Sequence, residues 1–194
     1  MKRICVFLGS NPGTRESYGL AAEALAEVLV ENGLGLVYGG SNVGLMGRLA
    51  NAVLERGGEV IGVIPEALVQ KEVAHDGLTD QHIVASMHDR KALMAQLADG
   101  FVAMPGGIGT LEELFEIFTW AQLGFHRKPF ALYNVEGYYD LLTDFLNHIS
   151  AEGFVMPAHR DMIIVSGDPG NIITRFAVYE PPVVDKWIER RSKL

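Results

Sequence analysis

The chain has little of what several large classes of protein depend on. Its single cysteine, Cys5, lies in the apolar run Ile4–Leu8, so it cannot form an internal disulfide, and a reducing compartment is expected. No apolar run reaches the length of about 20 residues that a membrane-spanning helix needs. The first residues lead straight into a predicted strand and lack the features of a signal peptide. We therefore expect a cytoplasmic protein that does not bind a membrane.

Basic residues are also few. The chain has 16 Lys and Arg against 24 Asp and Glu, and its net charge is −8, which argues against a basic surface for nucleic acid. A phosphorylated small ligand is compatible with this charge, because a few backbone N–H groups and one arginine can bind it locally. The 6 histidines are scattered without the H-x-x-x-H or H-E-x-x-H spacing of a zinc site, so we expect no metal.

The length of 194 residues fits one domain better than two. We place a nucleotide-binding domain at residues 1–180 and a tail at residues 181–194. The tail carries Trp187 and Ile188 and has a basic end. It is predicted to form a short helix that packs on the domain or on a second subunit, and a surface appendage is an equal alternative.

Short β-branched apolar runs alternate with longer segments of helical periodicity. The predicted strands are residues 4–8, 34–38, 60–64, 83–85, 101–104, 130–133 and 162–165. The predicted helices are residues 18–31, 45–56, 91–97, 111–123 and 138–151. Four methionines are predicted core residues: Met46, Met87, Met94 and Met104. The alternation predicts an α/β fold, with a Rossmann-like, doubly wound, mainly parallel sheet that has helices on both faces.

Three of the predicted strands end in glycine-rich turns, at residues 9–13, 39–44 and 105–110. In a doubly wound sheet, ligands bind beyond the carboxyl ends of the strands, so the three turns would lie along one edge. Together they indicate a nucleotide cleft more strongly than any one of them alone. Candidate loop contacts to the ligand are Gly9, Ser10, Gly39 and Gly40.

The third turn resembles a phosphate cradle. Gly106, Gly107 and Gly109 lack Cβ atoms where the backbone must turn sharply, and the helix that follows offers unpaired N–H groups and the positive end of its dipole. No Gly-Lys-Ser/Thr follows and the dinucleotide fingerprint lacks its third glycine, so ATP and NAD lose support. The same residues also fit a capping box, with Thr110 as N-cap and Glu113 at N3. Spacing alone gives the two interpretations about equal weight.

The helix after this turn is predicted to have two packed faces. At about 100° per residue, the side toward the sheet carries Leu111, Leu114, Phe115, Ile117, Phe118 and Ala121. The opposite side carries Glu112, Glu113, Glu116, Thr119, Trp120 and Leu123. A solvated face rarely has Trp beside Leu, so we expect a second packed surface there, such as a homodimer contact that adjoins the site.

Residues Pro105–Glu113 match the PGGxGTxxE motif of the Lonely Guy family, whose cytokinin-activating members are phosphoribohydrolases and many of whose members were once labelled lysine decarboxylases. Four further segments are similar to family elements: Tyr38–Gly40 with Gly44–Gly47, Ser86–Lys91, Thr119–Gly124 and Asn134–Tyr139. The resemblance covers nearly all of residues 3–178. It implies hydrolysis of the N-glycosidic bond of a purine nucleoside 5'-monophosphate, AMP or an N6-substituted AMP, to the free base and ribose 5-phosphate, without a cofactor.

The resemblance also implies roles for particular residues. Arg90 and Glu113 correspond to the catalytic pair. The positions that correspond to substrate contacts are Glu72, Lys91, Gly106, Gly107, Ile108, Gly109, Thr110, Leu111, Glu112 and Thr119. The surroundings of Glu72 depart from the Met-Pro-x-Glu pattern of the family, which makes this residue the least secure. Ser41 stands where many relatives have a third glycine.

The chemistry suits the two catalytic candidates. Cleavage builds positive charge on the sugar, which a carboxylate such as Glu113 can stabilise while it orients or deprotonates water. The guanidinium of Arg90 can stabilise the departing purine or hold the phosphate. As a structural alternative, Arg90 could form a surface bridge with Glu112 or Glu116.

Three other functions stay open at this stage. One is a non-catalytic carrier of a nucleotide or cofactor on the same fold. Another is a decarboxylase that uses pyridoxal phosphate, although no lysine stands out as its Schiff-base partner. The last is a nucleosidase of broader range than cytokinin precursors.

Overall fold

The computed structural model describes residues 1–69 and 74–182. These residues form a 7-stranded sheet in the order β4-β3-β2-β1-β5-β6-β7, and every neighbouring pair is parallel. The strands are β1 (Arg3–Phe7), β2 (Gly35–Tyr38), β3 (Val60–Pro65), β4 (Asp80–Val84), β5 (Gly100–Ala103), β6 (Phe130–Tyr133) and β7 (Ile163–Ser166). The predicted α/β fold with a doubly wound parallel sheet is confirmed.

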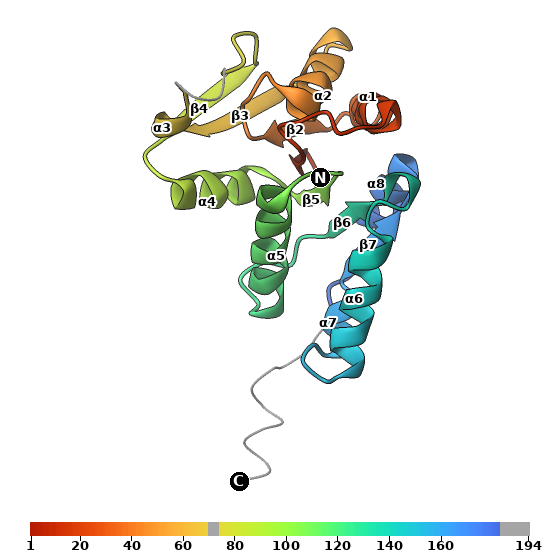
Figure 1. Cartoon of the computed structure of the whole chain (residues 1–194). Coiled ribbons are helices and arrows are strands. Elements are labelled where there is room, and N and C mark those ends of the chain that lie inside the picture. The colour runs from red at the N-terminus through yellow and green to blue at the C-terminus, as the bar shows by residue number, and fades with distance from the viewer. Residues whose placement is uncertain (70–73, 183–194) are drawn as a thin grey trace.

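Helices cover both faces of the sheet (Figure 1). The helices are α1 (Glu16–Glu31), α2 (Gly44–Glu55), α3 (Glu66–Val69), α4 (Met87–Leu97), α5 (Ile108–Gln122), α6 (Asp140–Ala151), α7 (Pro157–Arg160) and α8 (Pro169–Ala177), with a 3-10 turn, η1, at Val135–Gly137. One core cluster joins α1, α2 and α8 to the sheet, and a second joins α4, α5 and α6 to its other face. Strand residues alternate between the clusters, so Val6 lies in the first and Phe7 in the second.

Several elements differ from the sequence prediction. The short α3, α7 and η1 were not predicted, and α4 begins four residues before the predicted helix. Strand β4 begins at Asp80, three residues before the predicted strand, because it is an edge strand with a partly exposed, polar sequence instead of a continuous apolar run. Helix α8 was not predicted, although Asp168 accepts a hydrogen bond from Gly170 N at its start and Pro169 occupies the first turn. It buries Ile172, Ile173 and Phe176.

The single cysteine behaves as predicted. Cys5 lies fully buried in β1 with a free thiol, and burial raises its pKa well above the ordinary value.

No helix within the described residues is both long enough and apolar enough to span a membrane. The predicted tail lies outside the described residues from residue 183 onward.

Candidate active site

The order of the strands reverses beside β1, since β2 lies on one side of it and β5 on the other. The turns that follow β1 and β5 meet there. Gly9 N donates to Pro105 O at 3.2 Å, and a Cβ on Gly106 would lie 2.9 Å from Gly9 N. A side chain at position 106 would therefore push the turns apart, which explains the glycine. Such a switch point is where ligands bind on open α/β sheets.

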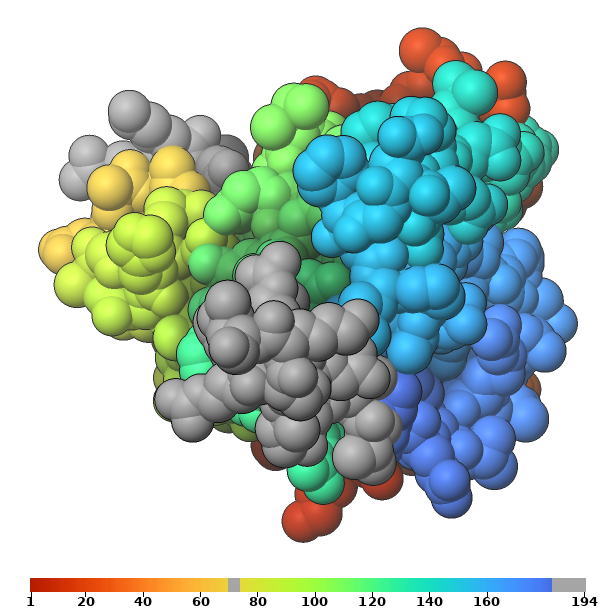
Figure 2. Space-filling view, turned by 90° about the horizontal axis from the view of Figure 1, so that it is seen from below, coloured from red at the N-terminus to blue at the C-terminus, as the bar shows by residue number. Residues whose placement is uncertain are grey.

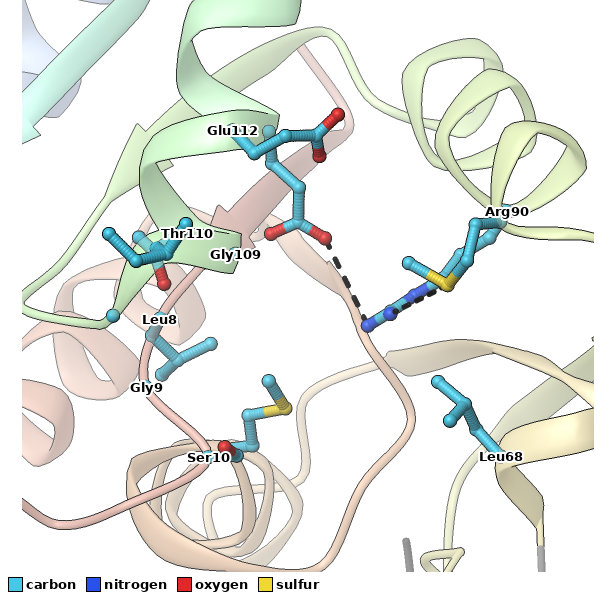
Figure 3. Close-up of a pocket in the computed structure, with 13 residues that line it drawn as sticks. Leu8, Gly9, Ser10, Leu68, Arg90, Gly109, Thr110 and Glu112 are labelled. Carbon is cyan, nitrogen blue, oxygen red and sulfur yellow. Dashed lines mark hydrogen bonds and ion pairs between the residues drawn. The ribbon is translucent and has the colours of Figure 1, made fainter. Parts of the chain in front are cut away.

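A cavity of about 340 Å³ opens at this point (Figure 3). It is lined by Leu8, Gly9, Ser10, Met46, Leu68, Met87, Arg90, Gly107, Ile108, Gly109, Thr110, Glu112 and Glu113. Nine of these thirteen residues were predicted site residues. The first and third glycine turns and both catalytic candidates therefore share one cavity.

Helix α5 begins in a way that excludes the predicted capping box. Its N-cap is Gly107, in extended backbone, and no side chain caps the helix. Thr110 is the third helical residue, buried against Gly106, whose Cβ, if present, would lie 2.1 Å from Thr110 Oγ1. The helix thus starts three residues earlier than the box requires, and Glu113 lies a full turn beyond its first residue. The carboxylate of Glu113 is not tied to the helix start.

Glu113 also lies on a different face of α5 from the one predicted. The buried stripe runs through Thr110, Glu113, Leu114 and Ile117, and Glu113 is only 8% exposed. Helical geometry places these residues on one side, because they are three and four positions apart. The polarity of the sequence predicts every glutamate of α5 on the outer face, because only apolar residues are expected to be buried. In the structure, the buried side of α5 packs on the sheet and also lines the cavity, and Glu113 lies where this side lines the cavity.

Arg90 approaches Glu113 from helix α4. The Ser86 side chain accepts a hydrogen bond from Asp89 N and caps this helix, and Arg90 follows in the first turn with 5% exposure. Arg90 Nη2 lies 4.0 Å from Glu113 Oε1, the ion pair dashed in Figure 3. The predicted alternative of a surface bridge to Glu112 or Glu116 is therefore wrong for Arg90, because its guanidinium is buried and turns toward Glu113.

The guanidinium of Arg90 is buried with few partners. Its Nη1 lies 3.8 Å from the sulfur of Met87, and its Nε has no hydrogen-bond partner among the described residues. Gly39 makes room for it, since a Cβ there would lie 2.2 Å from Nη2. Buried charged groups are normally paired and hydrogen-bonded. The arrangement leaves donors available to a ligand that accepts hydrogen bonds.

Burial raises the pKa of Glu113 to about 7, against the opposing effect of the Arg90 charge. The nearby carboxylate of Glu112 raises it further, and Lys91 lowers it. A carboxyl group with a pKa near neutrality can both accept and release a proton at physiological pH. Such a shift in a cavity is typical of a functional group.

Lys91, and not Arg90, forms the ion pairs with Glu112 and Glu116. Its Nζ lies 2.5 Å from Glu112 Oε1 and 3.0 Å from Glu116 Oε1. Burial lowers the pKa of Lys91, but the hydrogen bonds that Lys91 donates to Glu112 and Glu116 outweigh this effect, and the pKa is raised. The bridge ties α4 to α5 directly beside the pair of Arg90 and Glu113. Lys91 itself does not line the cavity.

The remaining predicted contacts lie around the cavity or outside it. Thr119 is exposed on α5 and donates from Oγ1 to Phe115 O at 2.7 Å. Leu111 packs partly buried against the core, and Gly40 follows Gly39 with a φ of +77°. Glu72 lies outside the described residues.

Sequence patterns missed the apolar part of the cavity wall. Leu8, Met46, Leu68 and Met87 line the cavity. Both methionines were predicted to lie in the core. Two signals were available, since Met46 directly follows the second glycine turn and Met87 lies one helical turn before Arg90. The other two methionines, Met94 and Met104, are buried as predicted.

Comparisons with known proteins identify the family. Residues 46–176 match the family model described as "Possible lysine decarboxylase". The chain is 51% identical over 168 residues to a cytokinin riboside 5'-monophosphate phosphoribohydrolase of Rhodococcoides fascians, covering 86% of this chain and 85% of that protein. It is 48% identical over 180 residues to an Arabidopsis thaliana enzyme of the same name, covering 93% and 83%.

A solved structure shares the fold. The molybdenum cofactor carrier protein of Chlamydomonas reinhardtii superposes with a TM-score of 0.68 at 21% identity, over 92% of this chain and 99% of that one. At this identity the match shows the fold alone. The sequence relatives go further, and by their identity and coverage the chain belongs to the Lonely Guy family of phosphoribohydrolases, the family first described as possible lysine decarboxylases.

Proposed function

We propose that the protein hydrolyses the N-glycosidic bond of a purine nucleoside 5'-monophosphate and releases the free base and ribose 5-phosphate. The observation that carries this proposal is the buried pair of Arg90 and Glu113, which faces the cavity beside the glycine turn. The two similar enzymes named above act on cytokinin riboside 5'-monophosphate, which is a substrate of this class.

The start of α5 binds the 5'-phosphate in this proposal. The first N–H groups of a helix have no intrahelical partner, and the helix dipole favours an anion there. Gly107 and Gly109 line the cavity, and a Cβ on either would meet nothing within 4 Å. A side chain at these positions would fill the space that the phosphate occupies. The phosphate thus serves as a handle whose binding energy orients the sugar.

Glu113 acts on the sugar. It lies five residues beyond Ile108, which corresponds to about 7.5 Å along the helix axis, the scale of a ribose 5-phosphate unit. Its carboxylate stabilises the positive charge that develops at the anomeric carbon. It also accepts a proton from the attacking water, for which a pKa of about 7 is well placed.

Arg90 acts on the leaving base. Its guanidinium lies beside Glu113 rather than beside the first turn of α5, which places it near the reacting centre. Its positive charge can stabilise the negative charge that gathers on the departing purine. The proposed site needs no metal or organic cofactor.

The base range follows from the apolar wall. Met46, Leu68 and Met87 line the cavity opposite the glycine turn, and methionine side chains adapt to different shapes. We propose AMP and N6-substituted AMP as substrates. Chromatography of products from AMP, N6-isopentenyl-AMP, GMP and CMP tests this range, and equal cleavage of all four nucleotides would contradict it.

The decisive test uses Glu113→Gln with AMP. We expect the unmodified protein to release adenine and ribose 5-phosphate, and the variant to lose activity by about 100-fold or more, since a positioned acid–base group contributes that much. Glu27→Gln, at an exposed position of α1, is the control and should retain full activity. Substantial turnover by Glu113→Gln would overturn the proposal. A carrier would bind AMP without releasing adenine, so the same assay separates the two functions.

The alternative of a decarboxylase with pyridoxal phosphate has little to support it. Lys91, the buried lysine nearest to the pair, is held by Glu112 and Glu116. Lys128 donates to Ala95 O and Ala98 O, each at 2.7 Å. An absorbance scan of the purified protein tests for bound pyridoxal phosphate.

The proposal includes a cytoplasmic homodimer. A second cavity, of about 380 Å³, is lined by Ala92, Ala95, Gln96, Phe101, Trp120, Phe125, His126 and Lys128. Phe125 in its lining is 74% exposed and Leu123, two residues earlier, is 41% exposed, as expected for a surface that a second copy covers. Phe125→Asp should halve the mass measured by light scattering. Phe154→Asp is the control, because Phe154 is 86% exposed in the loop after α6. The end of α6 and the segment that follows it form the light-blue surface in Figure 2. A monomeric unmodified protein would contradict the dimer.

A further inference from the structure

The segment between β6 and α6 reaches across to the turn that follows β5. Tyr139 donates from its hydroxyl to Met104 O at 2.5 Å, and Tyr138 donates to Gly106 O at 2.6 Å. Two consecutive tyrosines therefore hold the carbonyl groups on either side of Pro105. Neither tyrosine lines the cavity, so any effect on a ligand must act through the turn.

The two tyrosines are themselves firmly placed. The Tyr138 ring makes edge contacts with the rings of Tyr139 and Tyr18, at centroid distances of 4.9 and 5.6 Å. Tyr139 is 1% exposed, and its backbone N donates to Asn134 Oδ1 at 2.7 Å. The Asn134 amide in turn donates to Asp140 at 2.7 Å. Tyr138 itself is 42% exposed, and its two ring contacts and the buried neighbour Tyr139 hold its hydroxyl in place against the turn.

The bond to Gly106 determines which way one peptide group points. In a trans peptide, the carbonyl and the following N–H point in opposite directions. Because Tyr138 holds the carbonyl of Gly106 outside the cavity, the N–H of Gly107, which lines the cavity, is directed away from Tyr138. Glycines on both sides give this peptide unusual freedom to rotate. Without an anchor, it could present its carbonyl oxygen to an anion instead of its N–H.

We propose that Tyr138 is a positioning residue for the 5'-phosphate, which it serves by fixing the peptide between Gly106 and Gly107. This inference rests on the proposed function, because it takes the 5'-phosphate of the nucleotide as the ligand of the turn. Tyr138 affects binding of the phosphate end of the substrate, whereas Glu113 and Arg90 act at the reacting bond and the base.

The test is Tyr138→Phe, which retains the ring and its edge contacts and removes only the hydroxyl. Binding of ribose 5-phosphate and of adenosine is measured by calorimetry, together with kcat and KM for AMP. We expect ribose 5-phosphate to bind about three- to tenfold more weakly, as for the loss of one hydrogen bond, with adenosine binding unchanged. The KM for AMP should rise by a similar factor while kcat changes little.

A matched control is Tyr179→Phe, since the Tyr179 hydroxyl is buried and has no hydrogen-bond partner among the described residues. This variant should bind both ligands as the unmodified protein does. Equal weakening of ribose 5-phosphate and adenosine by Tyr138→Phe, or no weakening of either, would overturn the positioning role. So would an unmodified protein that does not bind ribose 5-phosphate. Failure to release adenine from AMP would instead refute the proposed function, since the binding comparison needs no turnover.

Discussion

Replacing Glu113 with glutamine removes a buried ionisable group and keeps nearly the same side-chain shape. The folded protein holds this carboxyl at a pKa of about 7, against an ordinary value of 4.5, because burial disfavours the charged form. In the unfolded chain, the pKa returns to the ordinary value. The substitution should therefore change stability by an amount that depends on pH.

The sign and size follow from linkage. Above pH 7 the carboxyl is ionised in both states, and the folded state bears the full penalty of a buried charge. Below pH 4.5 it is protonated in both states, and the penalty disappears. Each pH unit between the two pKa values corresponds to about 1.4 kcal/mol, so the full penalty is about 3 kcal/mol. Between pH 5 and pH 8 the penalty should grow by about 2.5 kcal/mol.

The assay is urea unfolding of both proteins at pH 5 and pH 8. The difference in unfolding free energy, Glu113→Gln minus unmodified protein, should be about 2.5 kcal/mol more favourable to the variant at pH 8 than at pH 5. Effects that do not depend on pH, such as burial of the new amide, cancel in this comparison. The exposed control Glu27→Gln should show no such change. An equal difference at both pH values would refute the argument that burial raises the pKa.

Three further predictions concern activity. The value of kcat/KM should fall about tenfold for each pH unit below about 7, as Glu113 becomes protonated, and a profile that stays flat down to pH 5 would contradict its role as a base. Gly39→Ala should displace Arg90, since the new Cβ would lie 2.2 Å from Nη2, and we expect at least a tenfold loss in kcat with AMP with circular dichroism unchanged. Gly109→Leu should raise the KM for AMP strongly, and it should lower the melting temperature by no more than a few degrees, because a Cβ there meets nothing within 4 Å. An unchanged KM would show that the phosphate does not bind at this turn.

The sheet could be predicted from the sequence because most of its strands are buried on both faces. Such strands are continuous apolar runs, as in Phe130–Tyr133, whose predicted and observed bounds agree. An edge strand has no such signal, which is why the polar start of β4 was missed. The site motif was equally visible, because glycine turns and a family pattern are local features of the sequence.

The orientation of Glu113 could not be predicted in the same way. A helical wheel ranks residues by polarity, and it assumes that the buried side of a helix faces only a hydrophobic core. In α5 the buried side also faces Arg90, a charged residue from α4. That meeting of two helices depends on the packing around β5, which no local pattern encodes. The role of Tyr138, thirty-two residues beyond Gly106, is a long-range contact of the same kind.

The reactive groups and the walls around them come from different parts of the chain. Arg90, the glycine turn and Glu113 all lie within one continuous unit, α4-β5-α5, whereas Met46 and Leu68 reach the cavity from the half of the sheet on the other side of β1. The first unit carries the bond cleavage and one wall residue, Met87, whereas the other half of the sheet supplies the rest of the apolar wall around the base. Directed evolution toward a new nucleobase can therefore vary Met46 and Leu68 while the sequence of residues 87–122 is left intact.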